Sequence, residues 1–230
     1  MDDWPTHLEN EDIRLALDLA QSVADWVEAA FGRGVDLHVS GRETIAVGAF
    51  FVVFEHHASV VALTKLHHRA SAHALLRPAF EALVRGLWVL AAEQSQLEHF
   101  QDGSRTGDPS KLLRVAADKN PRRKDYYDGL RATWEASSET LHTYTHHRFQ
   151  SLVRWSGEAS VHDTEVVDLL RFSASLCVEA AGEFVTLMAK HPVPGREDDT
   201  ARTVAGLRPH LERFTLGLVA LEQRTLDIRT

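Results

Sequence analysis

The chain has 230 residues, of which 44% are hydrophobic and 25% charged, so it can bury a large core and is unlike disordered chains. Its formal charge of -8 disfavours a general nucleic-acid coat but leaves room for a local basic pocket. Cys177 stands alone in the apolar run "FSASLCVEAA", which excludes an intrachain disulfide and predicts a buried, inert thiol.

The N-terminal sequence "MDDWPTHLENEDIRL" is acidic and lacks the basic start and apolar core of a signal peptide. No stretch reaches the roughly 18 uninterrupted apolar residues of a spanning helix, since "IAVGAFFVVF" stops at Glu55. We therefore expect a cytoplasmic protein with no membrane partner.

Apolar residues recur at helical spacing from the start of the chain, and no alternating strand pattern competes with them. The first expected helix begins after Asn10, a good N-cap, and ends at Gly32 and Gly34. The second runs from about Gly41 to Leu66.

The third expected helix, about 71–94, carries "SAHALLRPAFEALVRGLWVLAAEQ". Ser71 is a suitable cap for it. Pro78 predicts a kink, because proline removes one backbone hydrogen bond and clashes with the preceding turn.

The polar stretch "QDGSRTGDPSK" is typical of a loop, and a shorter helix follows at about 109–118. Pro121 suits the start of the next helix, in which "PRRKDYY" could contact phosphate or form a solvated charged helix start. The remaining helices are expected at about 162–190 and 200–227.

These elements predict an all-α fold, a bundle of six to eight helices. We expect a single domain over 1–230, with a core at about 10–190 and a C-terminal helix at about 200–227.

Polar residues follow one another at intervals of four along the third expected helix: His73, Arg77, Glu81 and Arg85. This spacing places them on one stripe of the helix. The stripe is either a surface ladder of weak ion pairs or a buried polar row whose charges must meet partners.

Two motifs resemble an uncharacterised bacterial family of helical proteins, namely "LLRPAFEALVRGLWVL" and, some sixty residues later, "YTHHRFQ". The resemblance covers about 45–185. It marks the following residues: Arg77, Glu81, Arg85, Trp88, Tyr144, His146 and Gln150.

That family is in turn distantly similar to HEPN helical bundles, which include toxin and antiviral ribonucleases as well as inactive binding members. HEPN nucleases carry an Arg and a His separated by four to six residues. This chain departs from that pattern, since three residues separate Arg69 from His73 and seven separate Arg154 from His162. The fold analogy is therefore better supported than the catalytic one.

One hypothesis is a metal-independent endoribonuclease in which His146 exchanges the proton of an attacking 2'-hydroxyl. Arg77 or Arg85 would stabilise the phosphate charge, and Glu81 would orient a guanidinium. The residues expected to help bind the ligand are Tyr144, Gln150, Arg148 and His73. The HEPN resemblance implies RNA, a homodimer and a cognate antitoxin or operon partner as candidate partners.

A second hypothesis is a divalent transition-metal site, zinc or nickel, because His142 and His146 are four residues apart on one helical face. "HHRFQ" resembles the "HHRGQ" of DinB-like bundles, in which an earlier histidine completes a three-histidine site. His56 or His57 would supply that ligand, although Phe149 replaces the glycine of the motif.

A third hypothesis is a non-enzymatic binding or interaction module without a cofactor, in which Arg77, Glu81 and His146 form a polar network that fixes helix register. All three hypotheses expect His146 close to Arg77, Glu81 or Arg85. A fully covered row would favour a structural role, whereas a row that opens beside a pocket would favour ligand binding or chemistry.

Overall fold

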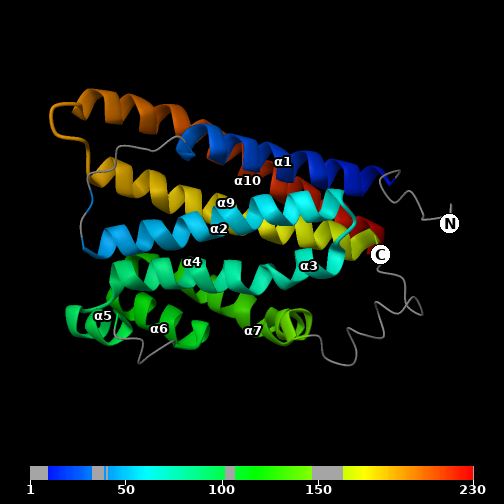
Figure 1. Cartoon of the computed structure of the whole chain (residues 1–230), viewed down its shortest axis with the longest axis horizontal. Helices are drawn as coiled ribbons and strands as arrows, with labels where there is room; N and C mark the ends of the chain where they lie inside the picture. The colour runs from blue at the N-terminus through cyan, green and yellow to red at the C-terminus, as the bar shows by residue number, and fades with distance from the viewer. Residues whose placement is uncertain (1–9, 33–38, 40, 102–106, 147–162, 230) are drawn as a thin grey trace.

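The computed structural model describes residues 10–32, 39, 41–101, 107–146 and 163–229, and within these ranges the side chains of 99–101, Tyr144, His146 and 224–229 are outside the description. Every regular element in the described part of the chain is a helix (Figure 1). The prediction of an all-α bundle is therefore confirmed.

The first two helices begin and end close to where the sequence predicts. Helix α1 spans Glu11–Phe31, and the Asn10 side chain caps it by accepting a hydrogen bond from the Asp12 amide at 2.8 Å. Helix α2 spans Arg42–Lys65 after Gly41, whose φ of 59° suits glycine. The two helices run antiparallel along the bundle (Figure 1).

The third expected helix is two helices rather than one kinked helix, so that prediction is wrong. Helix α3 spans Arg69–Ala74 and α4 spans Leu76–Ala91, with the break at Leu75. Pro78 has no N–H to donate to the carbonyl of Ala74, four residues earlier, and its ring crowds that carbonyl. Ser71 lies inside α3 and does not cap it, because the cap position is His68.

After α4, the described part of the chain forms short helices first and then long ones. Helix α5 spans Gln94–Gln101, where no separate helix was expected, and α6 spans Pro109–Lys119. A 3-10 turn, η2, at Pro121–Arg123 leads into α7, Lys124–His146. The last two helices are α9, Asp163–Lys190, and α10, Glu197–Arg229.

Helices α2, α4 and α9 pack on one another at the centre, with α1 and α10 on one side and α6 and α7 on the other (Figure 1). Their buried apolar side chains form one continuous cluster. Phe31, Phe54 and Phe184 meet where α1, α2 and α9 cross, and the Phe31 and Phe184 centroids are 4.7 Å apart. A second aromatic group, Phe80, Trp134 and Phe172, lies beneath the polar residues of α4.

Helices α2 and α9 are long and apolar enough to cross a membrane by length and composition alone. Their apolar windows are 39% and 67% buried within the bundle, and core helices of soluble proteins pass the same test. The expectation of no spanning helix rests on the lack of an uninterrupted apolar run. These two helices are apolar on average although they contain charged residues such as Glu55. Cytoplasmic localisation stays a prediction.

Candidate functional site

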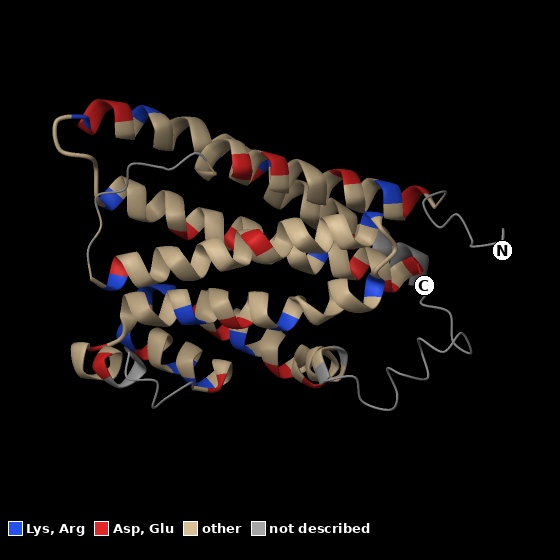
Figure 2. Ribbon diagram, in the orientation of Figure 1, with Lys and Arg blue, Asp and Glu red and all other residues tan. Residues whose placement is uncertain are grey.

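Three side chains of α4, those of Arg77, Glu81 and Arg85, form a continuous ion-pair row. Figure 2 shows basic and acidic positions alternating along the α4 ribbon. Arg77 Nε donates to Glu81 Oε1 and Arg85 Nη2 donates to Glu81 Oε2, both at 2.9 Å. The side chains of Arg77, Glu81 and Arg85 are 25%, 19% and 32% exposed. The row is therefore neither a freely solvated ladder nor a covered core network.

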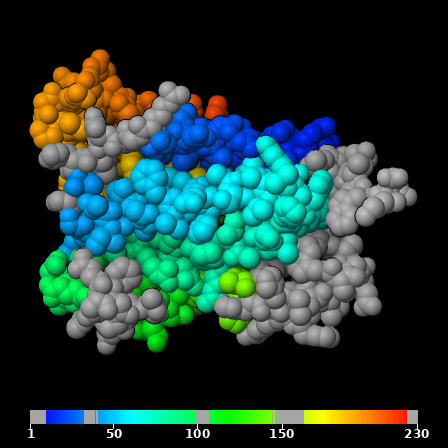
Figure 3. All heavy atoms as spheres, in the orientation of Figure 1, coloured from blue at the N-terminus to red at the C-terminus, as the bar shows by residue number. Residues whose placement is uncertain are grey.

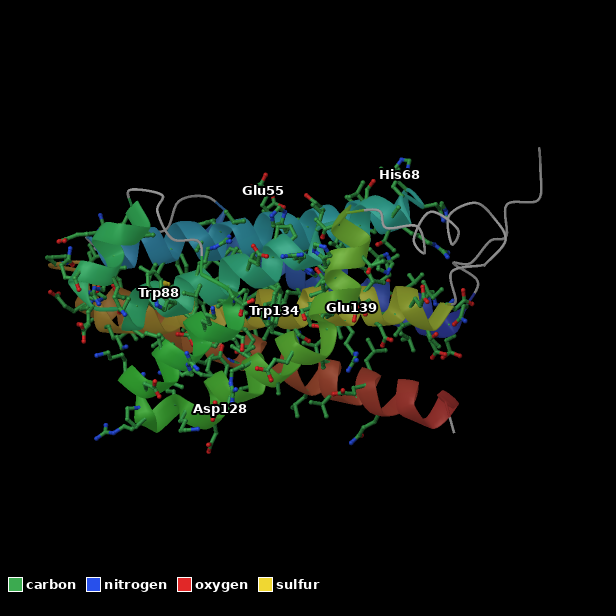
Figure 4. All side chains as sticks on the ribbon, turned by 90° about the horizontal axis from the view of Figure 1, so that it is seen from below. Glu55, His68, Trp88, Asp128, Trp134 and Glu139 are labelled. Atoms are coloured by element: carbon green, nitrogen blue, oxygen red, sulfur yellow. The ribbon has the colours of Figure 1, made fainter. Side chains whose placement is uncertain are left out.

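Helix α7 supplies the partners of this row. Arg77 Nη1 contacts His142 Nδ1. Because a guanidinium only donates, His142 Nδ1 is the acceptor in this contact. The Arg77 guanidinium also lies 5.8 Å from the ring centre of Trp134, which stacks on Phe80. Figure 4 labels Trp134.

A cavity of about 320 Å³ lies between α3, the first residue of α4, α7 and α9. Its polar lining comes mainly from His73, Thr140, Glu165, Asp168 and Arg171. Arg171 Nη1 pairs with Glu222 Oε1 of α10 at 2.7 Å, and its Nη2 lies 3.5 Å from Asp168 Oδ1. The cavity has the size of a small-molecule site, and its lining includes Leu76, the residue before Arg77, but no residue of the row itself.

His73 does not continue the row, although its spacing predicts that it should. It belongs to α3, ahead of the break at Leu75, and is buried. Its Nδ1 lies 2.8 Å from the carbonyl oxygen of Arg69. Its role as a ligand-binding residue stays a prediction, supported by its place in the cavity wall.

The sequence model of one protein family matches residues 50–203, more than half of the chain. This chain belongs to DUF6988, a family of unknown function. No curated protein matches the sequence, and no solved structure does. The resemblance to an uncharacterised family is confirmed at that level, and the matched range contains the row, its α7 partners and the cavity.

The predicted contact between His146 and the α4 row falls on side chains outside the description. Helix α7 of this DUF6988 protein ends at His146, but only its backbone and that of Tyr144 are described, and Arg148 and Gln150 lie outside the described residues. The described histidine that meets Arg77 is His142, one turn earlier. The four-residue spacing could have indicated it, since both histidines share a helical face.

His57, the third histidine of the alternative metal site, lies in the core. Its Nε2 lies 2.9 Å from the Ala20 carbonyl oxygen and its Nδ1 lies 2.9 Å from Ser173 Oγ. Burial lowers the pKa of His57 to about 4, which the hydrogen bond to Ala20 offsets only in part. Both ring nitrogens are already used, so metal binding by His57 would require breaking one of these bonds.

Among the residues whose side chains are described, no three His, Cys, Asp or Glu side chains gather as metal ligands. The three histidines of the metal hypothesis are His57, His142 and His146, and the side chain of His146 is outside the description. The metal hypothesis therefore stays a prediction. Cys177 is buried, and burial raises the pKa of its thiol. An inert structural thiol is consistent with both observations.

The "PRRKDYY" segment forms a second polar cluster that sequence reasoning missed. Arg123 donates to Glu183 through both terminal nitrogens, with Nη1 to Oε2 at 3.0 Å, and lies over the rings of Tyr126 and Tyr127. Burial, followed by the charges of Glu179 and Glu183, raises the pKa of Tyr126. These side chains pack on α9, so the solvated helix start expected for Arg123 and the tyrosines is wrong.

Proposed function

We propose that this DUF6988 protein is a cytoplasmic, HEPN-like binding module whose α4 row takes an anionic group, and that the ligand is RNA. The observation that carries the proposal is the partial exposure of Arg77 and Arg85, two cations that share one carboxylate. A network built only for packing would be covered and fully paired.

The row suits a phosphate group for two reasons. Glu81 accepts one hydrogen bond from each guanidinium and so holds both near one another, and Arg85 donates only one hydrogen bond among the described residues. Its remaining N–H groups match the geometry of phosphate oxygens. Two arginines and one glutamate also give the row a local charge of +1 on a chain with net charge -8.

The binding test is fluorescence polarisation with a labelled single-stranded RNA at several salt concentrations. Arg85→Gln removes one phosphate contact while Glu81 keeps Arg77 in place. Affinity should fall several-fold, and the slope of log K against log salt should shrink by about 0.7, the value for one lost contact to a single strand. Arg208→Gln, at an exposed arginine of α10, should change neither quantity.

The binding proposal is contradicted if the wild type does not bind RNA. It is equally contradicted if Arg85→Gln and Arg208→Gln have the same slope as the wild type, because binding would then occur away from the row.

Metal-independent RNA cleavage is a second candidate function, favoured by the contact between a histidine of α7 and Arg77. In this hypothesis His146 removes the proton of the 2'-hydroxyl, while Arg77 and Arg85 stabilise the negative phosphate. His142 would position Arg77 through its Nδ1.

The cleavage test is incubation of total RNA with the purified protein in EDTA. Cleavage by the wild type that is lost in His146→Ala and only reduced in His142→Ala would support this function. If the wild type binds RNA but does not cut it, the binding module is the better description.

We also propose a homodimer, which the HEPN resemblance implies. Light scattering should give twice the 25.7 kDa of one chain. A mass of one chain at micromolar concentration would contradict it.

A further inference from the structure

A second cavity, of about 470 Å³, lies between α1 and α2, away from the α4 row. These two helices lie side by side on the face shown in Figure 3. Alanines at three facing positions leave the hollow open, namely Ala24 of α1 and Ala58 and Ala62 of α2. We call this hollow the α1–α2 groove.

The wall of the α1–α2 groove is aromatic. Phe31 and Phe54 stack with centroids 5.7 Å apart, and Phe51 meets Phe54 edge-on at 5.7 Å. The Phe51 side chain is 38% exposed, although Phe184 also supports it from below at 5.6 Å. A large ring held in place at the surface offers an apolar face to a ligand.

The rim of the groove carries three carboxylates, from Asp25, Glu28 and Glu55, against one ammonium, from Lys65. These four side chains together carry a formal charge of -2. Lys65 Nζ donates to Gln21 Oε1 at 2.6 Å. No ion pair in the described part of the chain involves any of the three carboxylates, and Glu55 points outward in Figure 4.

The dimensions of the groove suit an elongated small molecule. Its α1 side runs from Gln21 to Gly32, which at about 1.5 Å per residue is ~16 Å. The volume of the groove, about 470 Å³, is that of a small-molecule site.

We propose that the α1–α2 groove binds an elongated hydrophobic organic cation, an aryl- or alkyl-ammonium. The apolar part would lie along the exposed ring of Phe51, which Phe54 and Phe31 support from within the wall. The ammonium would lie near the carboxylates of Glu28 and Glu55. This site is separate from the α4 row and does not depend on RNA binding.

Isothermal titration with 4-phenylbutyl-trimethylammonium tests the proposal, with a phenylalkyl alcohol of the same length as the neutral control. The cation should bind at least about tenfold more tightly than the alcohol, since several weak charge interactions add. The triple variant Asp25→Asn, Glu28→Gln, Glu55→Gln should lose that advantage and leave alcohol binding unchanged. Glu212→Gln, at an exposed acid of α10, is the matched control and should bind as the wild type does.

A substitution that fills the groove tests whether the two compounds bind there. Ala58 is exposed, so the ring of Ala58→Phe enters the groove without entering the core, and binding of both compounds should be lost. Phe51→Ala, which removes part of the wall, should weaken both. The proposal is overturned if the cation does not bind, if the alcohol binds equally well, or if Ala58→Phe folds normally and still binds.

Discussion

His57 donates from one ring nitrogen to the Ala20 carbonyl and accepts from the Ser173 hydroxyl through the other. The carbonyl can only accept, so the ring proton must be on Nε2 and Nδ1 must be unprotonated. A second proton would remove the acceptor of the Ser173 hydroxyl and place a charge in the core. The residue is therefore a neutral structural group, held by three helices.

His57 should make folding sensitive to acid. Its pKa is about 4 in the folded state and 6.5 in the unfolded state, so the unfolded chain binds the proton first. The stabilisation is complete above pH 6.5 and is lost as the pH falls towards 4, a change of about 3 kcal/mol. Urea unfolding between pH 7 and 4 should show a shallower pH dependence in His57→Gln. An unchanged slope would contradict this, and the exposed His68→Gln is the control.

The Arg123–Glu183 pair should contribute more to stability than an exposed pair does. Glu183→Gln leaves a half-buried guanidinium without its carboxylate, and we expect a loss of about 2 kcal/mol in the free energy of unfolding. This is less than for fully buried pairs, because the Arg123 side chain is 35% exposed. Asp128→Asn breaks the more exposed pairs with Lys124 and Arg131 and should lower the urea midpoint by clearly less than Glu183→Gln does. Equal losses in the two variants would contradict the assignment.

At the scale of the helices, α4 depends on close approach to α2. A Cβ at Gly86 would lie 2.6 Å from Cε1 of Phe50, a fully buried ring of α2. Gly86 therefore lets the central helices touch, and the same contact fixes which face of α4 turns its arginines outward.

Two glycine substitutions should have opposite signs. Gly86→Ala overpacks the contact with Phe50 and should cost about 1–3 kcal/mol of unfolding free energy. Gly182→Ala, in α9, meets no atom within 4 Å and should gain about 0.5–1 kcal/mol from helix propensity. Thermal melts of both variants measure the difference. A gain in stability for Gly86→Ala would show that the two helices do not touch there.

At the scale of the whole molecule, one buried cluster joins helices from α1 to α10. Trp26 of α1 packs against Phe214 of α10 at 5.5 Å, and Trp134 of α7 packs against Phe80 of α4 at 5.3 Å. The two tryptophans therefore report on opposite sides of the bundle.

The prediction of one domain over 1–230 can be tested with these tryptophans. Variants that keep only Trp26 or only Trp134 should unfold at the same urea concentration when followed by fluorescence, because a single cooperative unit gives coincident transitions. Two separate midpoints would show that the α1–α10 side and the α4–α7 side unfold independently.

Local signals in the sequence predicted most helix ends. Asn10 caps α1, α2 begins directly after Gly41 and α6 begins at Pro109, each where the sequence predicts a helix to start, because start signals act on the adjacent turn. The break at Leu75 was harder to predict, since Pro78 permits either a kink or a full interruption and the packing around it selects between them.

The sequence by itself determined the all-helical fold and the ion-pair row of α4, since helical periodicity and four-residue spacing act within a single helix. Only the tertiary structure decided that His142 reaches Arg77, that His57 is buried, and that Arg123 packs on α9. Each of these contacts joins residues more than thirty positions apart. Such contacts depend on how the helices pack against one another, which no local pattern of residues specifies.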